Sequence, residues 1–433
     1  MSRNLVFRDP GAIQEPKTSK SIFIMVLLVA ATSITPRIAV ATLEYERSLD
    51  LRYSDFLIVA ILYISLIAYL TGRKLILENP IMKPLLIYVL VSGIATLFGI
   101  LSGFIDTTRA VFFLLKEVEF YIVFFITLNI VRKRKDIAIV IWAILGFAPI
   151  NNIYAFYQII SKDFQSSSGF SVGLIGEASR FGVGGYLSLV FLLSMCMLVY
   201  CKLRGSAKVF LVLNAIASLF SLVYTASRSF IYGTVVATLV FFAITKKKKA
   251  YILSTVVIVM VVVLAVFFWD ALDPVIGERA TSVSWISRSV DIRVESSYAG
   301  IIEMISERPI IGYGKSITGT GGLPVEAHNT ILRLLWESGI IGLLVFAWLI
   351  YSIIRMSALT LKGGESDYNK VAASACILST ISIVVASTFQ DGFTAVKVNE
   401  IYWIIIGLTA VAYRLGGYGE NLANKESVSP SHG

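Results

Sequence analysis

The 433-residue chain has little charge, little histidine and little cysteine. Only 15% of its residues are charged, whereas 56% are hydrophobic and the mean hydropathy is +0.78. An ordinary soluble domain has about 25% charged and about 45–50% apolar residues. The shortage of charge therefore excludes a soluble globular protein and predicts an all-α polytopic membrane protein.

Several chemical motifs are also missing. The three cysteines, Cys196, Cys201 and Cys376, lie in or beside apolar segments and give no basis for a disulfide framework. The sequence has no Walker loop, no histidine pair for zinc and no Asp-x-Asp motif in its predicted outer segments. The sequence therefore shows no motif for nucleotide chemistry or metal-dependent hydrolysis. We expect neither a metal nor a cofactor.

Long apolar blocks account for most of the chain, and about 20 apolar residues suffice to cross a bilayer as a helix. They predict about twelve spans. Spans one to nine occupy 21–269 and spans ten to twelve occupy 330–414, between polar tails at 1–20 and 415–433. The individual spans are expected at 21–41, 54–71, 81–101, 110–131, 137–160, 182–201, 208–225, 229–245, 250–269, 330–355, 370–389 and 397–414.

The basic residues orient these spans. Most of the 38 lysines and arginines fall in alternate connections, and such residues collect on the cytoplasmic side of a membrane. This pattern predicts that both termini are cytoplasmic and that the connection 270–329 lies outside the cytoplasm. The net charge of +10 is then an orientation signal, so nucleic acid is not an expected partner.

The long connection 270–329, between spans nine and ten, carries structure of its own. An apolar stripe at helical spacing predicts a helix on the membrane surface or capping the bundle; its members are Val294, Tyr298, Ile301, Ile302 and Ile305. Glycine-rich, irregular backbone follows. A transporter would be expected to show two similar halves with sites at the bilayer midplane, and no internal repeat is visible.

One histidine stands at the end of this connection, in "VEAHNTILRLLWESGIIG". His328 is one of two histidines in the chain, and the other, His432, lies in the polar tail. Asn329 can cap the following helix, which would place His328 at the outer mouth of the tenth span. An imidazole can take a proton from a hydroxyl near neutral pH. His328 is therefore the candidate general base, with Glu326 and Asn329 as supporting residues.

Two intramembrane charge pairs have a structural interpretation. Arg333 and Glu337 are spaced i,i+4 and favour an intrahelical ion pair that joins helices. Lys116 and Glu119 are spaced i,i+3 and favour a local pair that faces the bundle.

Arginines on the predicted outer side suggest an anion site. Arg180 opens the sixth span, Arg228 lies between spans seven and eight, and Arg288 and Arg293 lie in the long connection. Guanidinium groups bind phosphate and diphosphate oxygens in a bidentate geometry that lysine cannot match. Arginines that converge near His328 would bind such an anion.

Three of these motifs together resemble a known family. "HNTILRLLWESGIIGLLVF", "SERPIIGYG" and "TASRSF" are similar to signatures of the bacterial O-antigen ligase and polysaccharide polymerase superfamily. The resemblance is strong from Tyr224 to Phe346 and architectural before that.

The resemblance implies a metal-independent inverting glycosyltransferase in the bacterial inner membrane, with its active site facing the periplasm. The donor would be a glycan linked to undecaprenyl diphosphate, and the acceptor a sugar hydroxyl on a glycan or glycolipid. The family histidine carries over to His328, and the diphosphate-binding arginines carry over to Arg180, Arg228 and Arg293, with Arg288 as a supporting neighbour. Membrane lipids and other polysaccharide assembly proteins are the remaining expected partners.

Alternatives stay open within and outside this family. The direct His-Asn sequence favours a polysaccharide polymerase, because ligases of the family typically show His-x-Asn/Ser/Gln. Thr330, in the second position after His328, could replace that Ser, so a ligase that transfers the glycan to lipid A core remains an alternative. A lipid-linked glycan flippase would also need cationic residues, but along a path between both membrane faces. A scaffold subunit of an assembly complex would need no histidine.

Overall fold

The computed structural model describes residues 21–34, 37–42, 48–72, 75–161, 180–225, 227–245, 299–315, 328–364 and 366–416, with the isolated residues 248, 252, 255 and 259. The first half of the fold consists of α1 (Ile22–Ile34), β1 (Arg37–Thr42), β2 (Ser48–Arg52), α2 (Tyr53–Leu70), α3 (Met82–Leu101), α4 (Thr107–Ile130), α5 (Arg134–Ser161) and α6 (Arg180–Tyr200). The second half consists of α7 (Gly205–Tyr224), α8 (Arg228–Thr245), α12 (Ala299–Glu307), α13 (Thr330–Gly363), α14 (Asp367–Ala386), the 3₁₀ turn η3 (Gly392–Thr394) and α15 (Val396–Leu415).

The helices confirm an all-α polytopic membrane protein. In the described part of the chain, eight helices are long and apolar enough to cross a membrane: α3, α5, α6, α7, α8, α13, α14 and α15. α1 and the apolar part of α2 are shorter, and α4 carries charged residues along its 24 residues. The predicted span 250–269 lies almost wholly outside the described residues.

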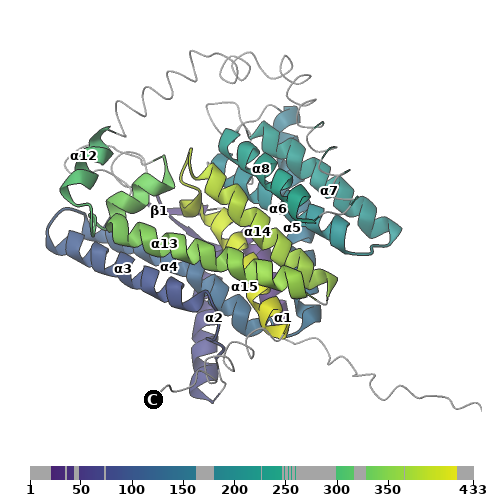
Figure 1. Ribbon diagram of the computed structural model, residues 1–433, viewed down its shortest axis with the longest axis horizontal. Helices are drawn as coiled ribbons and strands as arrows, with labels where there is room; N and C mark the ends of the chain where they lie inside the picture. Colours follow the sequence, from purple (N-terminus) through teal and green to yellow (C-terminus); the bar gives the residue numbers. More distant parts are fainter. Residues whose placement is uncertain are drawn as a thin grey trace, which may run out of the picture.

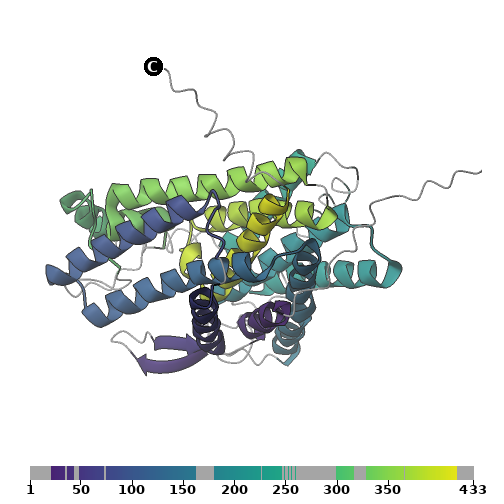
Figure 2. The same ribbon diagram turned by 90° about the horizontal axis from the view of Figure 1, so that it is seen from below.

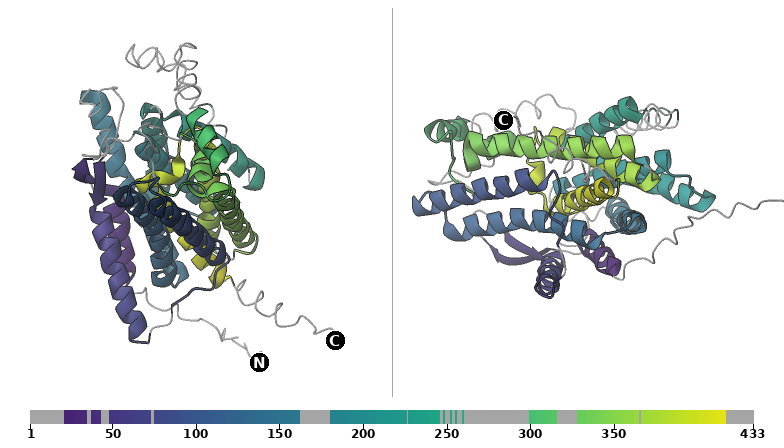
Figure 3. Two further views of the ribbon diagram at one scale, coloured as in Figure 1. Left: turned by 90° about the vertical axis from the view of Figure 1, so that its left-hand side faces the viewer. Right: turned by 60° about the horizontal axis from the view of Figure 1, so that its bottom comes forward.

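The first predicted span, 21–41, is wrong in its second half. α1 ends at Ile34, and Arg37–Thr42 pairs as an antiparallel strand with Ser48–Arg52. The segment "RIAVAT" is apolar enough to extend a span, but its β-branched residues also favour a strand. Figure 3 shows the resulting hairpin beside α2, on the side of the bundle that α1 and α2 cover.

Burial distinguishes central helices from outer ones. Nearly all of the apolar windows of α6 and α15 are buried, whereas only 39% of those of α3, α7 and α8 are buried. The exposed faces carry large apolar residues such as Leu86, Leu90 and Leu213, as a lipid-facing surface requires. α13 packs along α3 and α14, and Figures 1 and 2 show it running along the length of the molecule.

α13 is a broken helix rather than the uninterrupted span predicted at 330–355. Gly339 interrupts it with φ 62° and ψ −166°, a conformation that a side chain would strain. A break frees backbone groups, which must find partners inside a membrane protein. The segment 309–314 supplies them: Tyr313 N and Gly314 N each donate to α13 carbonyls at 2.8 Å, and Ile340 N donates to Pro309 O at 2.8 Å.

The helix predicted in the long connection is present as α12, beside the first part of α13 (Figure 1). Ile301 is buried, whereas Ile302 is 56% exposed, so the predicted stripe does not face one environment. Its other predicted members, Val294 and Tyr298, lie outside the described residues. The apolar contact that anchors α12 is a small cluster of Ile301, Tyr313 and Trp336.

Candidate functional site

The start of α13 is built around Asn329. Its Oδ1 accepts hydrogen bonds from Ile331 N at 2.8 Å and Leu332 N at 3.2 Å, which confirms the predicted helix cap. Its Nδ2 donates to Thr388 O at 3.0 Å, just beyond the end of α14. His328, half-buried, lies one residue before this cap. The histidine is therefore held at the end of a fixed helix rather than on a free loop.

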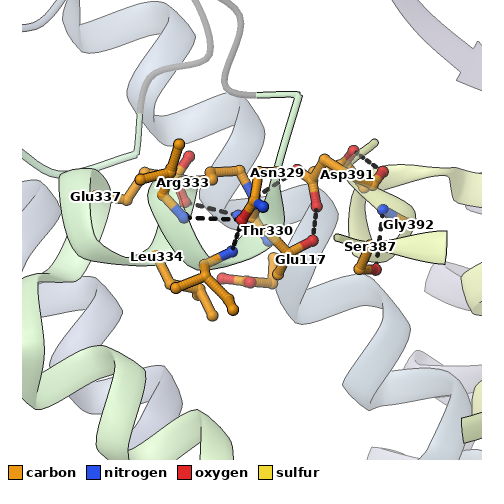
Figure 4. A network of polar contacts seen from close by, with 12 residues as sticks. Glu117, Asn329, Thr330, Arg333, Leu334, Glu337, Ser387, Asp391 and Gly392 are labelled. Atoms are coloured by element: carbon orange, nitrogen blue, oxygen red, sulfur yellow. Dashed lines mark hydrogen bonds and ion pairs between the residues drawn. The ribbon is translucent and has the colours of Figure 1, made fainter. Parts of the chain in front are cut away.

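A second set of contacts ties the same helix start to the connection between α14 and α15. Thr330 N donates to Ser387 O at 3.0 Å, and Thr330 Oγ1 donates to Asp391 Oδ1 at 2.6 Å. Figure 4 shows Thr330 and Asp391 joined in this way, with Ser387 and Gly392 beside them. The starts of α13 and α15 and the end of α14 therefore share one end of the bundle.

Arg228 lies at this end as well. It is the first residue of α8 and is exposed. One turn further along α8, the ring of Tyr232 lies 5.9 Å from that of Phe389, close to the carbonyl that Asn329 contacts. The structure thus brings the Ser-Arg turn and the His-Asn element to neighbouring positions.

The first turns of α6 pack against the α7–α8 turn at Gly184. Gly184 lies so close to this turn that a Cβ on it would be 2.7 Å from the Cβ of Ser227. Arg180 is the first residue of α6, but its side chain lies outside the described part of the structure. Glu326, Arg288 and Arg293 also lie outside the described residues, so their predicted roles remain predictions.

Below the start of α13 lies a buried network of charged side chains, called here the ion cluster: Glu117, Lys315, Arg333, Glu337 and Asp391. Lys315 Nζ contacts Glu337 Oε2 at 2.7 Å and Glu117 Oε2 at 3.0 Å. Arg333 contacts Glu337 at 2.7 Å and Asp391 at 2.5 Å. The predicted Arg333–Glu337 pair is confirmed, but it belongs to a network that also joins α4 and the α14–α15 connection.

Lys315 is the centre of this network. Its side chain is only 3% exposed, and its backbone N–H donates to Thr96 Oγ1 on α3 at 3.1 Å. Burial disfavours the ammonium charge, but Glu117 and Glu337 outweigh burial and hold the pKa of Lys315 above its ordinary value. Lys315 therefore holds the 308–315 segment against α4 and α13 through its contacts with Glu117 and Glu337.

A cavity of about 160 Å³ opens beside the ion cluster. Its charged wall contains Lys116, Glu117, Lys315, Arg333 and Glu337. Its apolar wall contains Phe112, Phe113, Phe120, Phe393 and Val396, with Thr394 between the two. The cavity is therefore lined by both aromatic rings and ionic groups.

Lys116 and Glu119 of α4 form ion pairs outside the ion cluster. Lys116 Nζ contacts Glu119 at 2.9 Å, which confirms the predicted local pair, and also contacts Asp55 on α2 at 2.7 Å. Glu117, between them, turns to Lys315 and accepts a hydrogen bond from Tyr88 at 3.0 Å. Three charges close together in sequence therefore serve two separate clusters.

Lys315 and Asp391 are functional candidates that the sequence alone does not reveal. Lys315 follows the glycines of "GYGKS", and Asp391 lies in "FQDGF", between two spans. Both look like ordinary connecting residues, because nothing local indicates that they are buried. The signal that could have indicated Lys315 is the charge of Glu117 inside a predicted span, which needs a buried cation.

The fold and the site define a polytopic helical membrane protein whose special polar residues gather at one end of the bundle and just beneath it. Residues 213–347 match the family model described as O-Antigen ligase. A protein of Rickettsia conorii named "Putative polysaccharide ligase" is 27% identical over 124 residues, which cover 25% of this chain and 27% of that relative. The resemblance to the O-antigen ligase superfamily is thereby confirmed over part of the chain. The matched residues include Arg228, Lys315 and His328, but not Arg180, Glu117 or Asp391.

Proposed function

We propose that the protein is a glycosyltransferase that moves a glycan from undecaprenyl diphosphate to an acceptor sugar hydroxyl. One observation carries the proposal: the segment that matches the O-antigen ligase family contributes both Arg228 and His328, and these residues lie at the same end of the bundle. A base and a cation at one mouth are the two groups that such a transfer needs. The matched segment is under a third of the chain, so the activity of the whole protein is our inference.

The reaction follows from the chemistry of these groups. His328 takes the proton of the acceptor hydroxyl as the oxygen attacks the anomeric carbon of the donor glycan. The bond between this carbon and the diphosphate oxygen breaks, and the lipid diphosphate leaves with its electron pair. Arg180, Arg228 and Arg293 would bind the diphosphate, so the leaving group needs neither a general acid nor a metal. A single displacement of this kind inverts the anomeric configuration.

The location follows from the distribution of basic residues. Both termini are then cytoplasmic, and the starts of α6, α8 and α13 face the periplasm of a bacterial inner membrane. The donor is a glycolipid of that membrane, and its diphosphate would reach the same end of the bundle as His328.

A polymerase is the form that we favour, in which one lipid-linked chain is moved onto the sugar of another lipid-linked repeat. The direct His-Asn sequence at His328 supports it, as does the long connection before it, which could enclose a second lipid-linked substrate. A ligase that transfers the glycan to lipid A core is the second candidate. The description of the matching family and the name of the Rickettsia relative favour it.

The test uses the purified full-length protein in lipid nanodiscs. It is supplied with lipid-linked repeat units in the absence of lipid A core, and the products are separated by chain length. A ladder of longer lipid-linked chains supports a polymerase, and transfer that appears only after lipid A core is added supports a ligase. If neither product forms but the glycolipid changes leaflet in vesicles that contain the protein, the protein is a flippase and the transferase proposal fails.

A further inference from the structure

A group of three carboxylates lies beside α4, on the side opposite to Glu117. This carboxylate trio consists of Asp55 in the first turn of α2, Glu119 in α4 and Glu400 in α15. One oxygen from each residue lies within 4.8 Å of the others. Three helices from distant parts of the sequence therefore bring acidic groups to one point.

The trio is buried, and each member has an oxygen without a hydrogen-bond partner. Glu400 is fully buried, and the side chains of Asp55 and Glu119 are 10% and 13% exposed. Within the described part of the structure, Asp55 Oδ1, Glu119 Oε1 and Glu400 Oε2 accept no hydrogen bond. Buried carboxylate oxygens are costly without a donor or a cation, so three of them at one point indicate a missing ligand.

In the described part of the structure, the trio has more carboxyl groups than cations beside it. Lys116 contacts Asp55 and Glu119, and Arg52 is close enough to Glu400 to act on its charge. Among the described residues, two cations therefore face three carboxyl groups, so one negative charge is left over when all three are ionised. Burial of a net charge in a helical bundle is unfavourable, so a further cation would stabilise this arrangement.

The spacing of the oxygens fits a hard metal ion. Calcium binds oxygen at about 2.3–2.6 Å, so two oxygens on the same ion lie no more than about 5 Å apart. The limit of 4.8 Å within the trio meets this condition. The hydroxyl of Thr32 on α1 lies beside Glu400, so it can serve as a fourth oxygen ligand.

We propose that Asp55, Glu119 and Glu400 bind a hard, oxygen-ligated metal cation of the calcium or sodium kind, which fastens α2 and α4 to α15. Ser54 Oγ donates to Glu400 Oε1 at 3.1 Å and orients this carboxylate, while Lys116 orients the other two. The ion would be structural. The proposal is independent of the glycosyl transfer reaction, because none of its ligands is a candidate catalytic or diphosphate-binding residue.

The experiment measures thermal stability and bound metal on the full-length protein in nanodiscs. The protein is first depleted with a chelator in choline chloride and then titrated with calcium chloride or sodium chloride at constant ionic strength. We expect one of the two cations to raise the Tm by about 3–5 °C at saturation, with about one ion bound per chain. A rise with calcium or with sodium identifies the ion. Equal Tm values in calcium, sodium and choline would mean that the carboxylates share a proton instead, and would overturn the proposal.

Variants separate the trio from other acidic groups. Glu400→Gln and Glu119→Gln keep the shape of the side chain but remove a charged ligand, so each is expected to weaken cation affinity by roughly tenfold or more. The readout is the difference in Tm with and without the cation, so a lower starting stability does not obscure the result. Glu303→Gln, at an exposed site on α12, is the control and keeps the full response. If both trio variants also keep it, the cation binds elsewhere and the site is wrongly assigned.

Discussion

Lys315 Nζ lies 2.7 Å from Glu337 Oε2, and both side chains are almost completely buried. Lys315 directly follows the segment 309–314 that hydrogen-bonds to the break in α13, and Glu337 lies two residues before that break at Gly339. The ion pair and the backbone contacts therefore hold the same junction. The first part of α13, which His328 precedes, is fixed in position by this junction and by the contacts of Asn329 and Thr330.

Removal of Lys315 tests how strongly the junction depends on its charge. Lys315→Met leaves Glu117 buried without its cation, and breaking such a pair costs about 3–5 kcal/mol. We expect a large fall in Tm and in the yield of monodisperse protein, measured by fluorescence-detected size exclusion. Lys208→Met, at an exposed position in α7, serves as the control and is expected to change the Tm little.

A second variant separates charge from packing. In Lys315→Met/Glu117→Gln the charges are removed together, and a large part of the lost stability should return. An equal or greater loss in the double variant would show that Lys315 acts through its shape and backbone contacts rather than through the ion pair.

Gly339 provides a matched test of the helix break. Gly339→Ala places a Cβ on a residue with φ 62° and against Ile310 O, so the 309–314 segment must move. We expect a loss of more than about 2 kcal/mol of stability and a loss of transfer activity. Gly93→Ala is the control, because that glycine lies inside α3 in open space, where a Cβ would have no atom within 4 Å, and alanine favours a helix there. Equal melting temperatures of the two variants would contradict the structural role of the break.

The helices of the bundle could be predicted from the sequence, because a long apolar block in the sequence is a direct indication of a membrane-spanning helix. Nine helices begin and end within three residues of the expected bounds: α2, α3, α4, α5, α6, α7, α8, α14 and α15. The break in α13 could not be predicted in the same way, because "ESGIIG" has the composition of a continuous span. It depends on hydrogen bonds from the 309–314 segment, which no local pattern reveals.

In the candidate site, too, local interactions could be predicted from the sequence and long-range ones could not. Asn329 is predictable as a cap because capping is a local interaction, and the structure confirms it. The ion cluster and the carboxylate trio each join residues from three or more distant segments, such as Asp55 and Glu400. Their members look like isolated charges in the sequence, and only the packing of helices shows which of them meet.

His328→Ala should abolish glycan transfer, because the acceptor hydroxyl loses its base. The protein should still insert and bind the lipid diphosphate, since the arginines and the cap at Asn329 are unchanged. The comparison is turnover in nanodiscs against donor binding measured on the same preparation. Turnover within a few-fold of the parent protein would exclude His328 as the base.

The arginines should act through the geometry of their guanidinium groups. Lysine keeps the charge but loses the planar fork, so Arg228→Lys is expected to weaken donor affinity and slow the reaction. Arg180→Lys and Arg293→Lys test the two positions whose side chains lie outside the described structure. If all three lysine variants bind the donor and react normally, the diphosphate is held by other residues.

Chelation separates a structural cation from a catalytic one. The proposed reaction uses His328 and arginines rather than a metal, so EDTA should leave the initial rate of transfer unchanged when the assay is run well below the Tm. If the carboxylate trio holds calcium, the same EDTA should lower the Tm of the protein, because it removes an ion that binds only the folded state. A rate that falls to background in EDTA and returns with magnesium, at a temperature where the protein stays folded, would contradict a metal-independent mechanism. The Glu400→Gln variant provides the control, because its Tm should no longer respond to EDTA while its rate can still be measured.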